Sequence, residues 1–154
     1  MHEHVRHEQQ LLERMIGRWN VEFECSSEAD SSVQGGESVR RLGDHWIIGE
    51  GSVGEGHEAM HSILTIGFDP RRERFVGTFI ASVMTNLWVY EGSVDADGRV
   101  LTLATEGPHP TEDRLARYED IFEFVNDDHR TLTSRVLEQD GTWQQVMLAN
   151  YRRV

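Results

Sequence analysis

The stretch His57-Glu58-Ala59-Met60-His61 has the spacing of a zinc-protease motif, in which two histidines bind the metal and the glutamate activates water. That chemistry requires an α-helix, because one helical turn brings the roots of the two imidazoles to about 6 Å. Here the motif runs directly into a predicted strand at 62–68, where residues four apart are separated by about 13 Å. We therefore expect a loop at the rim of the fold and no metal.

A second group of histidines lies near the N-terminus. In a helix, His4 would share a face with His7 and with Glu8, and His2 lies close by, which is a weak arrangement for a borderline metal ion. We favour a solvated helix end instead, and we expect no cofactor. The single cysteine, Cys25, is expected on the inner face of a strand as a structural thiol, and it excludes an internal disulfide.

Aromatic side chains, methionines and a few polar groups alternate along several predicted strands. If these faces point inward, they line a cavity of the kind that binds small molecules. In the alternative, they are ordinary core aromatics, and Glu50 and Asp120 face water. The predicted ligand-binding residues are Trp46, Glu50, Met84, Asn86, Trp88, Tyr90, Tyr118, Asp120, Phe122 and Met147.

No complete catalytic constellation is present, and the sequence lacks a nucleophile elbow, a phosphate loop and a C-x-x-C pair. An enzyme would use Asp120 or Glu50 as acid or base, with Tyr118 or Tyr90 orienting the substrate. Either carboxylate, if buried, needs a partner such as Arg40 or Tyr118, or a raised pKa.

The elements that must position these residues begin with a helix at 3–16. Val5, Leu12, Met15 and Ile16 form one apolar stripe, and Gly17 stands where a helix end favours positive φ. From 19 onward the period changes to two, which predicts a strand that opens with a tryptophan.

Turn signals then recur about every ten residues, as in antiparallel strands joined by short loops. About ten strands in a row without intervening helices predict an all-β, up-and-down meander that closes into a barrel and removes its exposed edges. A barrel of that size is wider than its side chains can fill, so we expect one domain, 1–154, with an internal cavity. The predicted strands after the first are 36–42, 45–53, 59–68, 74–82, 86–94, 100–106, 116–125, 131–138 and 143–152.

The composition limits the partners. The 154 residues are 38% hydrophobic and carry a net charge of −12, which disfavours nucleic acid and anionic membrane surfaces. No apolar run could span a bilayer, and the N-terminus resembles no secretory signal. We expect a cytoplasmic protein that binds a small apolar or aromatic ligand. The sequence is compatible with a monomer and with a homodimer.

Two stretches resemble known families. Gly17-Arg18-Trp19 before meandering strands, with a terminal Tyr151-Arg152-Arg153, resembles the calycin group of lipocalins and fatty-acid-binding proteins. In that group the tryptophan plugs one end of the barrel and a basic residue of the last strand packs over it. The resemblance implies these roles for Trp19 and for Arg152 or Arg153.

The segments GESVRRLGDHWIIGEG, ILTIGFDPRRERFVGTFIASVMTNLWVYEGSVD and FEFVNDDHRTLTSR are similar to bacterial domain-of-unknown-function family 1579. That resemblance supports a lipocalin-like fold and adds no catalytic residue. A more distant relation to the haem-binding nitrobindin barrels implies a third hypothesis, in which His61 or His109 is an axial ligand. The leading hypothesis remains a binding barrel, with an enzyme that uses the same cavity as the second.

Overall fold

The computed structural model describes residues 2–24, 32–54 and 56–154, with the side chains of 2–6, 32 and 58 outside that description. Cys25 lies outside the described residues. One helix is followed by ten strands and a single 3-10 turn. These elements are α1 (His2–Met15), β1 (Gly17–Glu24), β2 (Ser32–Leu42), β3 (Trp46–Val53), η1 (Gly56–Glu58), β4 (Met60–Asp69), β5 (Arg74–Ala81), β6 (Trp88–Val94), β7 (Val100–Pro108), β8 (Leu115–Asn126), β9 (His129–Leu137) and β10 (Trp143–Arg153).

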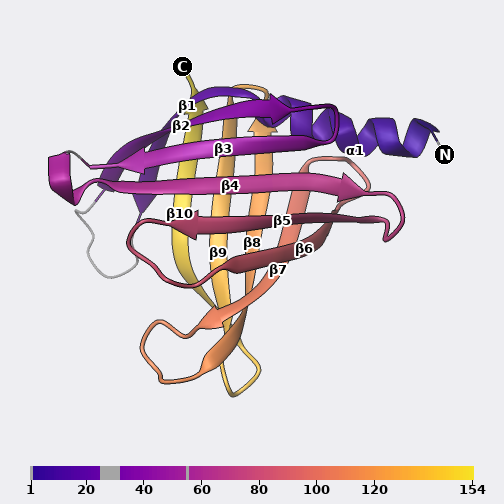
Figure 1. Cartoon of the computed structure of the whole chain (residues 1–154). Coiled ribbons are helices and arrows are strands. Elements are labelled where there is room, and N and C mark those ends of the chain that lie inside the picture. The colour runs from indigo at the N-terminus through magenta and orange to yellow at the C-terminus, as the bar shows by residue number, and fades with distance from the viewer. Residues whose placement is uncertain (1, 25–31, 55) are drawn as a thin grey trace.

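The ten strands form one closed antiparallel barrel in which each strand pairs with its neighbours in sequence (Figure 1). The first strand closes the sheet against the last, with Trp19 opposite Arg153 and Phe23 opposite Ala149. Within the described barrel every strand therefore has a partner on both sides. The predicted all-β, up-and-down barrel with one N-terminal helix is therefore confirmed.

Helix α1 packs against the end of the barrel at which β1 begins. Leu11, Leu12 and Met15 are 2%, 1% and 0% exposed, so the apolar stripe faces the core as its spacing predicts. Gly17 has a φ of +131°, which turns the chain from the helix into β1. Trp19 is 1% exposed, and its indole N–H donates a hydrogen bond to the carbonyl oxygen of Met15 at 2.9 Å. The tryptophan thus joins the helix to the core.

The basic residue of the last strand that covers Trp19 is Arg153. Its guanidinium lies 4.2 Å from the centre of the indole ring and donates hydrogen bonds to the carbonyl oxygens of Ile16 at 2.8 Å and Arg14 at 2.9 Å. Arg152 pairs with the outward-facing Asn20 and is exposed. Of the two candidate arginines, Arg153 is therefore the one that packs over the tryptophan. Arg153 also donates to carbonyl groups that the helix end leaves unpaired.

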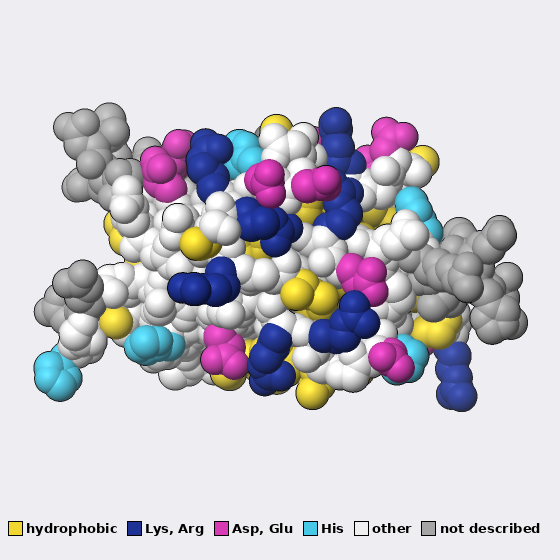
Figure 2. Space-filling model, turned by 90° about the horizontal axis from the view of Figure 1, so that it is seen from above, with side chains coloured by type: hydrophobic (Ala, Val, Ile, Leu, Met, Phe, Trp, Pro, Cys, Tyr) yellow, Lys and Arg dark blue, Asp and Glu magenta, His cyan; other side chains and the backbone are white. Residues whose placement is uncertain are grey.

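The outer surface mixes both signs of charge. Seen from above, arginine side chains alternate with aspartates and glutamates, and single apolar side chains lie between them (Figure 2). Exposed ion pairs such as those of Arg72 and Arg74 with Glu91, at 2.6 and 2.8 Å, continue this pattern on β5 and β6 and the turn before them. Within residues 2–24, 32–54 and 56–154, no helix is long and apolar enough to cross a membrane.

Candidate ligand-binding cavity

A cavity of about 690 Å³ occupies the barrel interior. The helix closes the end where β1 begins, and in an up-and-down barrel the β3–β4, β5–β6 and β7–β8 connections lie at the opposite end. Residues from the β5–β6 and β7–β8 connections, among them Met84 and Pro110, line the cavity, and so do Val53 and Met60 at the ends of β3 and β4. The mouth of the cavity is therefore at the end away from α1. Most of the wall is apolar. The apolar and aromatic residues of the wall include Val21, Phe23, Val53, Met60, Leu64, Phe79, Val83, Met84, Trp88, Phe122, Leu132, Val146 and Met147.

An aromatic wall near the mouth is built around Trp88. A Cβ atom at Gly107 would lie 2.3 Å from the ring of Trp88, so the glycine provides the space that the indole occupies. Tyr118 meets the same ring edge-on, with ring centres 5.0 Å apart and planes at 86°. The hydroxyl of Tyr118 donates a hydrogen bond to the carbonyl oxygen of Pro108 at 2.5 Å, and burial raises its pKa. These contacts fix the orientation of a flat aromatic surface.

Asp120 is an acidic residue midway along β8 that lines the cavity. Its Oδ2 atom accepts a hydrogen bond from the hydroxyl of Tyr90 at 2.5 Å, and the side chain of Ser134, directly opposite on β9, is a second hydrogen-bond partner. Burial raises the pKa of Asp120, while the two hydroxyl groups oppose that shift. Burial also raises the pKa of Tyr90 well above its ordinary value, and the carboxylate of Asp120 adds to this effect. Tyr90 therefore remains a proton donor to Asp120.

A second polar pair lies deeper, next to the helix plug. Arg130 is 1% exposed, donates a hydrogen bond to Glu37 at 2.6 Å, and lies 4.0 Å from the ring centre of Tyr151 and 4.7 Å from that of Trp19. A Cβ at Gly49 would come within 2.9 Å of the Glu37 carboxylate, so the glycine leaves room for it. Arg130 was not among the residues predicted from the sequence. Its position on the inner face of β9, where the neighbouring inward residue is Leu132, was the available signal.

Eight of the ten residues predicted to bind ligand line the cavity, namely Met84, Asn86, Trp88, Tyr90, Tyr118, Asp120, Phe122 and Met147. The inward orientation expected for Trp46 and Glu50 is wrong. Trp46 is 41% exposed and its ring covers Gly67 on the outer face, while Glu50 is exposed at 3.8 Å from Arg40. Glu50 is therefore no candidate for an acid or base of the cavity, whereas Asp120 and Tyr118 remain available.

The lining also offers a hydrogen-bond donor without a partner. The amide nitrogen of Asn86 is buried, and it makes no hydrogen bond to any residue that the structure describes. Buried donors in folded proteins are nearly always paired. Because protein atoms cover this nitrogen, a ligand acceptor atom could pair with it only after the Asn86 side chain turns toward the cavity.

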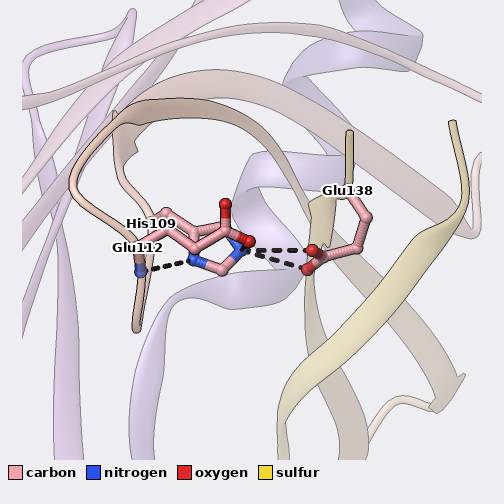
Figure 3. Close-up of side chains that lie close together, drawn as sticks. All are labelled: His109, Glu112 and Glu138. Carbon is pink, nitrogen blue, oxygen red and sulfur yellow. Dashed lines mark hydrogen bonds and ion pairs between the residues drawn. The ribbon is translucent and has the colours of Figure 1, made fainter. Parts of the chain in front are cut away.

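His109 forms a compact cluster with two glutamates at the rim (Figure 3). Its Nδ1 atom accepts hydrogen bonds from the backbone N–H groups of Thr111 and Glu112 at 3.2 and 3.1 Å, so in the neutral ring the proton is on Nε2, which donates to Glu138 at 3.1 Å. A metal ion at Nε2 would need that proton on Nδ1, where two donors already point. Arg114 also donates to Glu112 at 2.8 Å and lowers the pKa of that carboxyl. The cluster thus ties the β7–β8 loop to the end of β9.

The other histidines of the two sequence motifs are not among the described residues that line the cavity. Residues 57–61 do not form an α-helix, as the sequence predicts. The 3-10 turn η1 ends at Glu58, and β4 begins at Met60. His57 and His61 are exposed, and the side chain of Glu58 lies outside the described residues. At the N-terminus, the side chains of His2 and His4 also lie outside them.

The prediction of a solvated helix end is wrong for Glu8. Glu8 is only 5% exposed, so this position on α1 is packed rather than solvated. His7 is exposed as a whole, but a Cβ at Gly98 would lie within 3.0 Å of its ring. The helix therefore contacts the turn between β6 and β7 already at this position.

Comparison with solved structures finds two redesigned β-barrels among the matches. A redesigned β-barrel, b11L5F_LGL, superimposes with a TM-score of 0.51 at 6% sequence identity, covering 94% of this chain and 95% of that chain. A second redesigned barrel, mFAP1 bound to DFHBI, has a TM-score of 0.44 at 13% identity, covering 96% of this chain and 99% of that one. At such identities the likeness concerns the fold alone. No curated protein matches the sequence. The model of the family "Protein of unknown function (DUF1579)" matches residues 4–153, and the chain therefore belongs to that family.

Proposed function

We propose that this protein binds a small, largely apolar ligand in the interior of its barrel. The observation that carries the proposal is the cavity of about 690 Å³, which lies within the usual range of about 300–1,000 Å³ for small-molecule sites. Its wall is mainly aliphatic and aromatic, with a few polar groups such as Asn86 and Asp120 placed among them. Such a wall supplies affinity through burial and orientation through the polar groups.

Two neighbours on β9 provide a matched test. Leu132 lines the cavity, whereas Thr133 is the next residue and points to the opposite face of the sheet. Leu132→Trp should fill part of the cavity and weaken the binding of a neutral aromatic probe, 2-naphthalenemethanol, by about ten-fold or more in calorimetric titration. Thr133→Trp should leave the affinity unchanged. Equal affinity in both variants, or no binding to the wild-type protein, would contradict the proposal.

The natural ligand is best sought by native mass spectrometry of protein purified from its own host. A bound mass that disappears in Leu132→Trp and persists in Thr133→Trp would identify the occupant of the cavity. The proposal includes a cytoplasmic location, for which the presence of only one cysteine is the support.

A second function draws on one specific observation. Asp120 is a buried acid with a raised pKa and a short hydrogen bond to Tyr90, and perturbed acids in cavities are candidate catalytic groups. In that case Asp120 would exchange a proton with the bound molecule, and conversion of the ligand found by mass spectrometry would be lost in Asp120→Asn. The haem hypothesis has no comparable support, because no histidine is among the described residues that line the cavity.

A further inference from the structure

The charges inside the cavity do not balance. Among the described residues that line it, the charged side chains are Glu37 and Asp120, and both are acids. Glu37 is paired with Arg130 at 2.6 Å. Asp120, in contrast, is hydrogen-bonded to uncharged hydroxyl groups, and no arginine or histidine of the described chain lies within ion-pair distance of it. Asp120 is half-buried in the cavity wall, and a carboxylate withdrawn from bulk water in this way is costly unless a positive charge compensates it.

The hydrogen bonds of Asp120 leave acceptor capacity for a ligand. A carboxylate offers about four lone-pair positions. The hydroxyl of Tyr90 occupies one of these on Oδ2, and Ser134 is the other partner. Because Asp120 also lines the cavity, a bound molecule can reach the remaining positions.

The surroundings of Asp120 favour a cation over a neutral donor. Phe122 and Tyr118 flank it on the same inward face of β8, and Tyr90 faces it from β6. Aromatic faces attract cations, and the combination of aromatic rings with a carboxylate suits an ammonium group. A ligand with its own carboxylate would bring a third negative charge into this space, since Arg130 is already engaged by Glu37.

We infer that the ligand carries a protonated amine on an apolar, aromatic-sized body, and that Asp120 receives this amine inside the cavity. This inference rests on the proposed function, since it names the chemical class of ligand for the same cavity. In this arrangement the amine lies against Asp120 and the aromatic rings, while the apolar body extends toward the mouth.

Three naphthalene compounds that differ only in charge test the inference. They are 2-naphthylmethylamine, which is a cation at neutral pH, 2-naphthalenemethanol, which is neutral, and 2-naphthoic acid, which is an anion. The readout is the ratio of the amine affinity to the alcohol affinity in calorimetric titration. We expect a ratio of about ten or more for the wild-type protein, with the acid binding most weakly. Asp120→Asn should bring the ratio to about one. Glu123→Gln, which removes the same charge from an exposed position on β8, should leave the ratio unchanged.

The outcomes separate the two proposals. A wild-type ratio near one with measurable alcohol binding, or a ratio that persists in Asp120→Asn, overturns the amine assignment and leaves the binding function intact. Failure of all three compounds to bind overturns both. If Asp120→Asn does not fold, the pH dependence of the wild-type ratio decides. The groups that face Asp120 from the other strands are Tyr90 and Tyr151, with the Glu37–Arg130 pair beyond them. Burial raises the pKa of both tyrosines, so neither ionises below neutral pH. The ratio should therefore fall as Asp120 is protonated in acid, and a constant ratio would overturn the assignment.

Discussion

Replacing Trp19 by alanine tests whether the barrel is closed around this residue. The side chain is 1% exposed, and its indole N–H donates to the carbonyl oxygen of Met15 at 2.9 Å. Truncating a buried tryptophan costs about 3–5 kcal/mol, and the lost hydrogen bond adds about 1 kcal/mol. We therefore expect Trp19→Ala to lower the free energy of unfolding by about 4–6 kcal/mol, a large part of the roughly 5–15 kcal/mol of a typical domain.

Arg153 should contribute less than the ring that it covers. Its guanidinium lies 4.2 Å from the indole centre and donates to the carbonyl oxygens of Ile16, Arg14 and Asp127 at 2.8, 2.9 and 3.0 Å. A cation–π contact is worth about 0.5–2 kcal/mol, and the partly exposed hydrogen bonds add to it. Arg153→Ala should therefore cost about 2–3 kcal/mol. Arg153→Lys should recover less than half of that, because lysine lacks the flat, forked donor.

Urea denaturation of the single mutants and of the double mutant measures these values. The double mutant should lose about 0.5–1.5 kcal/mol less than the sum of the single losses, because the arginine has no ring to cover once Trp19 is gone. Arg152→Ala, a change at the exposed neighbour, should lie within about 0.5 kcal/mol of the wild type. The reasoning would be refuted by a Trp19→Ala loss below about 1 kcal/mol, or by strict additivity with Arg153→Ala.

Three further predictions concern the interior. Burial raises the pKa of Asp120, so the folded protein keeps this proton to a higher pH than the unfolded chain, and the stability contribution falls as pH rises through that range. The melting temperature of Asp120→Asn relative to the wild type should therefore be higher at about pH 7 than below the unfolded pKa of about 3.9, and equal differences on both sides would argue against a raised pKa. Glu37→Gln should cost about 3–5 kcal/mol in denaturant melts, because it leaves the charge of Arg130 buried without its counter-ion, and a loss near zero would mean that the pair is solvated. Gly107→Ala should displace Trp88, since a Cβ would lie 2.3 Å from its ring, and an unchanged tryptophan emission spectrum would contradict that placement.

The elements with a local signal were predictable from the sequence. The apolar stripe that contains Leu12 and Met15, the glycine at 17 and the change of period at Trp19 each depend on neighbouring residues, and the structure has the helix and first strand where they predict them. The barrel was predictable because consecutive strands joined by short turns favour pairing with their neighbours in sequence, and closure removes the exposed edges.

The face of β3 was not predictable in the same way. Trp46, Ile47 and Ile48 place apolar side chains on both faces of the strand, while the inward positions that follow are the glycines at 49 and 51. Glycine contributes no hydropathy to the alternation, so the pattern lost the signal that distinguishes inside from outside. Trp46 and Glu50 were therefore assigned to the wrong face.

The buried ion pair lay beyond sequence reasoning for a different reason. Arg130 and Glu37 are 93 residues apart, and only the closed barrel brings β2 and β9 to either side of the same interior space. Charged residues in strands are usually outside, so neither position attracted attention. The partner of Asp120 was missed similarly, because Tyr90 reaches it from β6 rather than from a neighbouring strand.

The pairing of β1 with β10 has a consequence for how the chain is made. During synthesis β1 emerges before every other strand, and its second neighbour, β10, is the last of the barrel strands to follow. One edge of β1 therefore stays unpaired until the other strands have been translated, and contacts so distant in sequence form slowly. A nascent chain that pauses before β10 would expose that strand edge, a feature that leads to aggregation or recruits chaperones.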